Sequence, residues 1–371
     1  MADQEGRGIR CTPTRWRLIA SGVLLTACPL LVLLFERFGE ALSGGYRPFS
    51  KGLLSLQATV ASVAPFALWD FFVVGLALTA LFTFVRRVVR RRPLLPWLSV
   101  VLLVSSATLF LFVSGWALNH YAPSLANEIG LEVGAYTDDE LAATTRHYLE
   151  RAAALAPSVP RGEDGELLRQ DFYELARIAG GSYRELSESY GIFEGSQAPV
   201  KALLLLGEPL LLSGHVGIFF SPTGESSVPV NCAVADLPFT MCHEAAHRLA
   251  IAREQEANFA AFLACTTSDD VRFSYSGYYS AFSFCYGALR RSDPDRAARL
   301  LDEVRTSGLD AGVGLVLADL VATGRHYDAY EGWFGRVGSA VNDGYLRSFG
   351  EREGVKSYGL VVDYLIAWDR R

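Results

Sequence analysis

Two histidines and a glutamate in the segment Cys242–His247 have the types and spacing of a zinc hydrolase centre. In a helix, His243 and His247 lie one turn apart on one face, so both imidazoles can bind a single Zn2+ ion. Glu244 then flanks the open coordination position, where a carboxylate can act as general base toward a water molecule. The chain has only six histidines, so a chance match to this pattern is rare.

A zinc ion that keeps a water molecule needs a third protein ligand, and two glutamates follow the histidines closely. They are Glu254 and Glu256, at the start of a second, largely apolar predicted helix. We favour Glu254, because Asn258 lies one turn further along the same face and could orient a ligating histidine. Only six residues separate His247 from Glu254, so the chain must turn sharply near residues 250–252. Glu256 stays open as the alternative ligand.

The segments before the metal helix predict a small sheet. Residues 201–235 contain short apolar runs separated by proline and glycine, which is typical of one or two short strands with turns. An edge strand at 215–220 could pair with an extended peptide substrate, or the sheet could simply cover the core. Residues 237–240 offer an entry to the metal helix, with Thr240 as a candidate N-cap.

Other segments predict further helices, at about 137–155, 166–179, 273–289 and 360–368. The third of these is rich in aromatic residues. Tyr275 and Tyr278 could donate hydrogen bonds to an oxyanion, although aromatic residues at this density more often form a core. The segments 341–346 and 354–359 predict a loop packed near the site, before the final helix.

Half of the chain is hydrophobic, and the excess is concentrated before residue 120. Apolar stretches at about 18–35, 65–85 and 94–118 are long enough to predict three transmembrane helices. We therefore expect a membrane domain at 1–120 and a zincin-like domain at 121–371. The expected fold class is membrane-anchored and mainly α (α+β), with a mostly helical zincin-like domain and a small β-sheet.

The distribution of arginines predicts the orientation in the membrane. Arginines precede the first span and cluster at 86–92, between the second and third spans. By the positive-inside rule, the N-terminus is cytoplasmic and the catalytic domain extracytoplasmic in the cell membrane. The first span could instead be a cleaved signal peptide, but the spans that follow favour an anchor. Asp70, near the start of the second span, is either a functional residue or one that reaches water.

The charge gives no support for a nucleic-acid partner, and the cysteine spacing argues against two kinds of cysteine site. The net charge of −6 gives no indication of nucleic-acid binding. The six cysteines lack Cys-x-x-Cys spacing, so a cysteine zinc site or a thioredoxin-like motif is not expected. Sequence leaves open whether Cys232, Cys242, Cys265 and Cys285 form disulfides or stay as buried thiols.

Nearly the whole chain resembles a bacterial family of unassigned function with three N-terminal spans followed by a zincin-like domain. The motifs that carry the resemblance include the HExxH segment and stretches of both the membrane region and the domain. They are Pro65-Phe66 with Asp70, Trp116–Asn119, Phe219–Glu225, Cys242–Phe259, Tyr275–Tyr278, Val341–Leu346 and Val355–Asp363.

More distantly, the site is similar to that of the gluzincin metallopeptidases. That resemblance implies Glu254 as the third ligand and places Asn258 where the group usually has aspartate. Where the resemblance is closest, glycine is expected at the turn between the two helices, and this chain has Ala250 there.

These observations lead to the hypothesis of a membrane-bound zinc metallopeptidase that hydrolyses peptide or protein substrates and contacts the lipid bilayer. The alternatives are a non-catalytic receptor or assembly protein built on a zinc scaffold, and an amidase that acts on cell-wall peptides. A capped rather than open metal position would indicate the scaffold.

Overall fold

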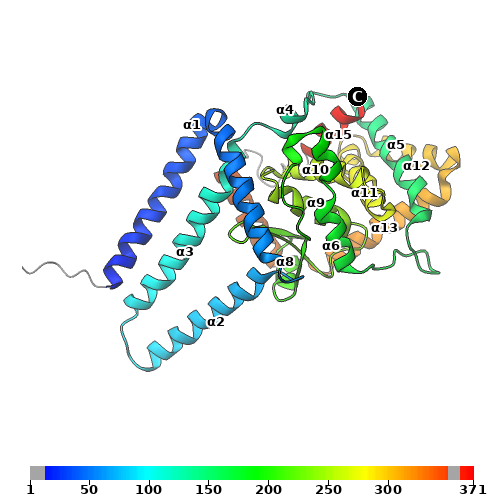
Figure 1. Cartoon of the computed structure of the whole chain (residues 1–371). Helices are drawn as coiled ribbons and strands as arrows, with labels where there is room; N and C mark the ends of the chain where they lie inside the picture. Colours follow the sequence, from blue (N-terminus) through cyan, green and yellow to red (C-terminus); the bar gives the residue numbers. More distant parts are fainter. Residues whose placement is uncertain (1–12, 350–359) are drawn as a thin grey trace, which may run out of the picture.

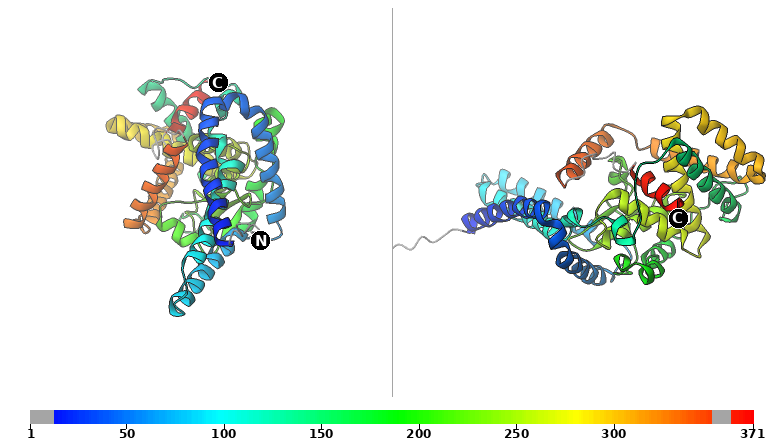
Figure 2. Two further views of the ribbon diagram at one scale, coloured as in Figure 1. Left: turned by 90° about the vertical axis from the view of Figure 1, so that its left-hand side faces the viewer. Right: turned by 90° about the horizontal axis from the view of Figure 1, so that it is seen from above.

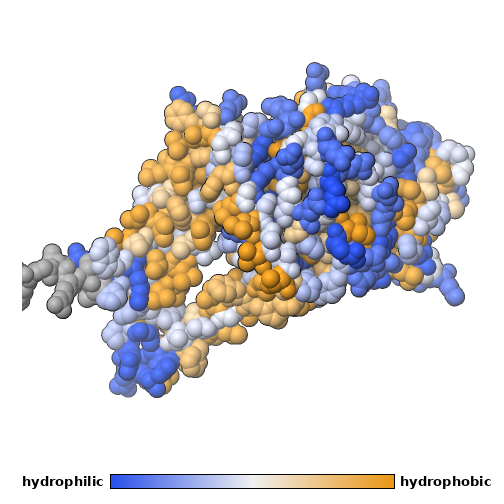
Figure 3. Space-filling view, in the orientation of Figure 1, coloured by the Kyte–Doolittle hydropathy of each residue, from blue (hydrophilic) through white to orange (hydrophobic). Residues whose placement is uncertain are grey.

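The computed structural model describes residues 13–349 and 360–371, and three long apolar helices form one end of the molecule (Figure 1). They are α1 (Pro13–Ala61), α2 (Leu68–Val89) and α3 (Leu95–Gly115), and α1 packs along α3. Large apolar side chains are exposed along all three, and Figure 3 shows this surface in orange. An exposed apolar surface of this extent is typical of contact with lipid.

Helix α1 is longer than the predicted first span. The predicted span ends at about residue 35, but the chain stays helical to Ala61, with a break in the helical backbone at Phe38. The charged side chains in this part of α1 do not end the helix, because they find partners later in the chain: Arg47 pairs with Glu128 at 2.6 Å, and Lys51 donates to the Ile192 carbonyl. The second half of α1 therefore packs on residues that follow the three apolar helices.

Four helical segments in the described part of the chain are long and apolar enough to cross a membrane, one more than predicted. The fourth, Pro294–Asp328, consists of α12 (Pro294–Val304), a π-helical turn η4 (Arg305–Leu309) and α13 (Asp310–Asp328). It lies on the side of the molecule away from α1–α3 (Figure 1). Gly312 packs so tightly on α5 that a Cβ there would lie 2.1 Å from the Ala153 carbonyl oxygen.

The rest of the described chain is mostly helical with one small sheet, as predicted. Helices α5, α9, α10 and α11 enclose the main core, and α15 covers it. The helices of this part are α4 (Leu125–Ile129), α5 (Asp138–Leu155), α6 (Phe172–Gly181), α7 (Arg184–Ser189), α8 (Gly207–Leu212), α9 (Leu237–Arg248), α10 (Glu254–Thr266), α11 (Val271–Ser292), α14 (Trp333–Ser348) and α15 (Val361–Asp369). Short 3₁₀ turns are η1 (Ala117–Tyr121), η2 (Ala156–Ser158) and η3 (Gly191–Phe193).

The sheet has the strand order β1-β3-β2, with β1 (Lys201–Leu203) parallel and β2 (Ile218–Phe220) antiparallel to β3 (Glu225–Pro229). The sequence predicted one or two short strands at 201–235, and the structure has three. The predicted loop at 341–346 is wrong, because these residues belong to α14. Residues 354–359, also predicted to be a loop, lie outside the described residues. The helix predicted at 166–179 begins later, at Phe172, with Asp171 as its N-cap.

Two buried carboxylates join the sheet to the start of α2. Asp70 is fully buried and accepts hydrogen bonds from the backbone N–H groups of residues 204–206 at 2.7 to 3.0 Å. In return, Glu225 of β3 accepts from the N–H groups of Leu68 and Trp69, in the first turn of α2. Asp70 therefore serves a structural role and does not reach water. Reciprocal capping of this kind satisfies backbone donors that burial would otherwise leave unpaired.

The cysteines of the described residues are free. Cys28, Cys232, Cys242, Cys265 and Cys285 are all buried thiols. This answers the question that the sequence left open in favour of buried thiols, which pack as small apolar side chains.

Candidate metal centre

The motif helix α9 begins four residues earlier than the sequence indicated. Asp236 occupies the N-cap position and Pro238 lies in the first turn, where its missing N–H costs nothing. Thr240 is therefore not the N-cap; its N–H donates to the Asp236 carbonyl at 2.8 Å. Helix α9 is almost wholly buried, and Ser226 of β3 donates its hydroxyl hydrogen to the Glu244 carbonyl at 2.6 Å. The sheet thus fixes the helix that carries the histidines.

The chain reverses between α9 and α10 at Ala250, within the predicted turn. Ala250 has a φ of 63°, in the left-handed region that favours glycine. Its N–H bonds the His247 carbonyl at 3.0 Å, and the Ile251 N–H bonds the Ala246 carbonyl at 3.3 Å. This turn brings the first residue of α10 back over the histidines of α9.

The conformation of Ala250 leads to a prediction about stability. An alanine-to-glycine change within a helix lowers the stability by about 1 kcal/mol. At a left-handed position, glycine also removes a backbone strain of about 1 kcal/mol, and this offsets the loss. We therefore expect Ala250→Gly to change the free energy of unfolding less than Ala260→Gly in α10, although both side chains are fully buried. Urea unfolding of the two variants compares them directly. An equal loss in both would contradict strain at Ala250.

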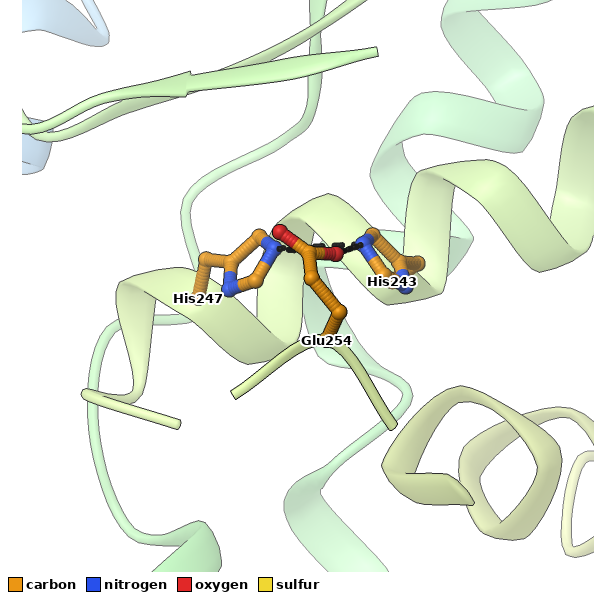
Figure 4. A group of neighbouring side chains, drawn as sticks. All are labelled: His243, His247 and Glu254. Carbon is orange, nitrogen blue, oxygen red and sulfur yellow. Dashed lines mark hydrogen bonds and ion pairs between the residues drawn. The ribbon is translucent and has the colours of Figure 1, made fainter. Parts of the chain in front are cut away.

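Three side chains converge on one point between α9 and α10 (Figure 4). The Nε2 atoms of His243 and His247 lie 3.1 Å apart, and Glu254 Oε2 lies 3.2 Å from the first and 3.7 Å from the second. Ligand atoms at about 2.1 Å from a tetrahedral zinc ion are about 3.4 Å apart. The three side chains therefore fit the donor set and spacing of a metal site.

The charges in the group indicate that it accommodates a cation. Burial raises the pKa of Glu254, but the two imidazoles outweigh this effect and hold that pKa well below its usual range. Burial lowers the pKa of His247, but the carboxylates of Glu254 and Glu244 outweigh it, and the pKa rises to about 9. The buried carboxylate thus requires positive charge beside it, which a divalent metal ion can supply.

The ring of His247 is held in the orientation that metal binding needs. Its Nδ1 lies 2.8 Å from the Ile251 carbonyl oxygen, an acceptor that keeps a proton on Nδ1, so Nε2 is the nitrogen that would give up its proton to bind a metal. Trp116, just beyond α3, packs edge-to-face on this ring and donates its indole N–H to the His247 carbonyl at 2.9 Å. The end of the third apolar helix is therefore part of the site.

Glu244 lies beside the three candidate ligands and lines the same site. Its side chain is buried, and its Oε2 has no hydrogen-bond partner among the described residues. Burial raises the pKa of Glu244 to about 7, against the opposing effect of the two histidines. A carboxylate with a pKa near neutrality and a vacant acceptor is suited to take up and release a proton.

Glu256, the alternative ligand, and Asn258, the expected partner of a histidine, form no hydrogen bond with either histidine in the described part of the chain. Glu256 accepts from Arg253 at 2.8 Å and from the Tyr364 hydroxyl at 3.3 Å, so the structure brings Glu254 and not Glu256 to the histidines. Asn258 lines the cavity, but its Nδ2 has no partner among the described residues, and the expected hydrogen bond to a histidine is not formed.

The two tyrosines proposed as oxyanion donors do not line the cavity. The Tyr275 hydroxyl donates to the buried Asp319, and the Tyr278 hydroxyl contacts Arg151 at 3.2 Å. Both residues lie on α11, where their rings pack in the core, as the alternative interpretation proposed. They are not candidates for catalysis.

A cavity of about 790 Å³ opens in front of the three candidate ligands. Its walls come from α3, from the segment between α8 and β2, from α9 and α11, and from α14. Sequence reasoning did not assign Trp116 to the site, and it placed His215 and Gly217 only in a possible substrate-pairing strand. His215 lies in the predicted edge strand. A histidine two residues before a glycine, in an otherwise apolar segment, was the signal in the sequence that could have identified both residues. A cavity of this size accommodates several residues of a peptide.

Gly217 has no side chain, and the Glu244 carboxylate occupies the space where a Cβ atom would lie. A Cβ at this position would lie 2.4 Å from Glu244 Oε1 and 2.8 Å from its Cδ. β2 begins at the next residue and is an edge strand of the sheet, so the backbone of this segment runs directly beside the proposed base. The sequence predicted an edge strand at 215–220, and the structure has one at 218–220.

We expect Gly217→Ala to lower any hydrolytic activity of this site about 100-fold, since a shift of about 1 Å in a reacting group costs that much. Glu244 must move, while the candidate metal ligands stay in place. Zinc content and turnover, measured on the same preparation, separate these effects. Gly181→Ala in α6, where a Cβ meets nothing within 4 Å, is the control. Unchanged turnover in Gly217→Ala would rule out a positioned Glu244.

Together these features define a mainly helical protein with long apolar helices at its N-terminal end and a buried His–His–Glu group that could hold a metal ion. Over residues 46–366 the chain matches the family described as "Protein of unknown function (DUF3810)", and it belongs to that family. Comparison with curated proteins and with solved structures finds no match. The resemblance to a family of unassigned function is thus confirmed, and the likeness to gluzincins stays a prediction.

Proposed function

We propose that this chain is a membrane-anchored zinc metallopeptidase in which His243, His247 and Glu254 hold the metal ion. One observation carries the proposal: three ligands from α9 and α10 face an open cavity, beside a buried carboxylate oxygen without a partner. Among the described residues, no fourth His, Cys, Asp or Glu joins the group. A site with three protein ligands and an open position is typical of catalytic rather than structural zinc.

A zinc ion bound here would act as a Lewis acid and bring the pKa of a water molecule to about 7. Glu244 accepts the proton of the attacking water and passes it to the leaving amine nitrogen, so one group serves as base and then as acid. The edge strand β2 can hold the substrate backbone in an extended form by main-chain hydrogen bonds. His215 lines the same cavity, and its Nδ1 lies 2.9 Å from Ser213 Oγ. When the Ser213 hydroxyl donates to Nδ1, the ring proton is on Nε2, which can donate a hydrogen bond to the developing oxyanion.

For the topology, we propose three spans formed by the first half of α1, α2 and α3, with the N-terminus cytoplasmic and the catalytic domain outside. The start of α1 and the arginine-rich connection between α2 and α3 lie at the end of the molecule far from the domain (Figures 1 and 3). This arrangement places the basic residues on one side of a bilayer and the domain on the other. The segment Pro294–Asp328 packs on the domain instead.

The test is hydrolysis of a mixture of unmodified peptides by the full chain in lipid nanodiscs. We expect new peptide ends in mass spectra, their loss with a zinc chelator and their return when zinc is added. Stoichiometric zinc without cleavage of any peptide would instead support the non-catalytic scaffold.

A further inference from the structure

Helix α14 exposes an apolar stripe that the rest of the described chain does not cover. Trp333, Phe334, Val337 and Val341 recur at helical spacing, and between 48% and 68% of each residue is exposed. The rings of Trp333 and Phe334 contact each other at 4.2 Å between centroids. Four large apolar residues on one face of a helix normally pack against a core, so this face calls for an apolar partner.

A neighbouring face of α14 is fixed to the protein at the ends of the apolar helices. The Tyr345 ring lies 5.9 Å from Phe112, in the last turn of α3, and Leu346 is fully buried. Near its start, Gly338 approaches Ser213 so closely that a Cβ would lie 2.2 Å from the Ser213 carbonyl oxygen. Figure 2 (right) shows α14, in dark orange, between the apolar helices and the body of the domain.

The apolar stripe continues toward α2. Ser213 directly follows α8, and the residues before α8 include Leu204 and Leu205, which are 46% and 44% exposed. The backbone N–H groups of these two leucines bond Asp70 in the first turn of α2, next to the exposed Phe71 and Phe72. Exposed apolar side chains therefore run from the domain-side end of α2, past α8, to α14.

This continuity identifies the partner as the lipid bilayer. An amphipathic helix with Trp and Phe on its apolar face lies in the boundary between headgroups and acyl chains, which is where the domain-side ends of α2 and α3 must also lie. The same helix lines the metal cavity through Gly338, Val341, Asn342 and Tyr345, and α3 lines it through Phe112 and Trp116. Elements at the membrane surface thus form two walls of the cavity.

We propose that the apolar face of α14 inserts into the bilayer surface, so that the metal cavity accepts extended peptide segments of polypeptides anchored in that same membrane. A segment next to a transmembrane helix or a lipid anchor enters the cavity from the membrane side. The substrate class rests on the proposed peptidase function, whereas the insertion of α14 does not.

The first experiment tests the insertion alone. Single-cysteine variants at Val337 and at Leu168, which is a 50% exposed apolar residue away from α14, carry a fluorescent label in the full chain reconstituted into vesicles. We expect quenching groups on the lipid chains to quench the label at 337 several-fold more than the label at 168. Equal quenching at the two positions would overturn the insertion of α14.

The second experiment tests the substrate class with one peptide sequence presented in two forms. The peptide is either free in solution or tethered to the same vesicles by a transmembrane anchor. Tethering raises the local concentration, so we expect the wild type to cleave the tethered form at least about tenfold faster. Equal rates would overturn the assignment of a membrane-anchored substrate.

A variant separates membrane seating from catalysis. Trp333→Ser, Phe334→Ser and Val337→Ser together change the exposed stripe and no residue that lines the cavity. We expect this triple variant to cleave the free peptide at the wild-type rate and to lose most of its advantage on the tethered one. Unchanged preference would contradict a role for α14. If neither peptide is cleaved by the wild type, the peptidase proposal fails, while the quenching result still decides the position of α14.

Discussion

Glu244→Gln is expected to retain zinc and to lose about 10³-fold in peptide hydrolysis, the contribution typical of a general base. The amide has the shape of the carboxylate but cannot accept the proton of the attacking water. Glu244 is no member of the group of candidate ligands, so the metal should stay bound. Its Oε2 has no partner among the described residues, so the free energy of unfolding should change by less than about 1 kcal/mol.

The measurement is turnover of a cleaved peptide, together with zinc content and thermal unfolding of the same sample. Glu188→Gln, an exposed glutamate on α7, controls for the change in charge and should behave as wild type. A Glu244→Gln protein with full zinc and full activity would exclude the proposed mechanism.

Glu254→Gln is expected to lower zinc affinity about 10³-fold, because one of three ligands is lost from a site whose binding energy is about 10 kcal/mol or more. The amide oxygen carries no charge, so it balances neither the metal ion nor the buried imidazoles. The loss is measured by competition with a chromophoric chelator, at a pH where wild type binds stoichiometrically. Hydrolysis at limiting zinc should disappear with the metal.

Glu256→Gln is the matched control, two residues away on the same helix. It weakens the contact with Arg253 and the hydrogen bond from Tyr364, so we expect lower stability with zinc affinity unchanged. The pair of variants also decides the question that the sequence left open. Loss of zinc in Glu256→Gln with retention in Glu254→Gln would mean that the other glutamate is the ligand.

Local spacing was enough to predict the centre of the site. His243, His247 and Glu254 lie within 12 residues, and their convergence depends only on two helices and one tight turn. Helical periodicity and the apolar runs likewise indicated most of the helices and the mainly helical class. Such features depend on neighbours in the chain, which a single sequence contains in full.

Contacts between distant segments could not be predicted in this way. Trp116 is 131 residues before His247, whose carbonyl it binds, and nothing in either segment identifies the other. Gly217 is conspicuous only once Glu244 is seen beside it. Asp70 was predicted to be functional or hydrated because its partners, the amides of residues 204–206, are invisible in the sequence.

Two local predictions failed because tertiary packing outweighed local preference. Asn342, Asp343 and Gly344 are typical turn residues. Tyr345 and Leu346, which follow them, pack on the protein, and α14 stays helical through all five residues. In α1, the predicted first span ends at about residue 35, but the same helix continues to Ala61, where its second half packs on the rest of the chain. In both segments the partner surface determines the conformation.

The bonds that cross residue 120 affect how this protein can be prepared. A fragment of residues 121–371 would lack Trp116, whose indole bonds the helix of the candidate metal ligands, and Asp70, which bonds three amides before α8. It would also leave the buried carboxylate of Glu225 without the N–H groups of Leu68 and Trp69. Inactivity of such a fragment would report on the truncation, and assays belong with the intact chain in a bilayer mimic.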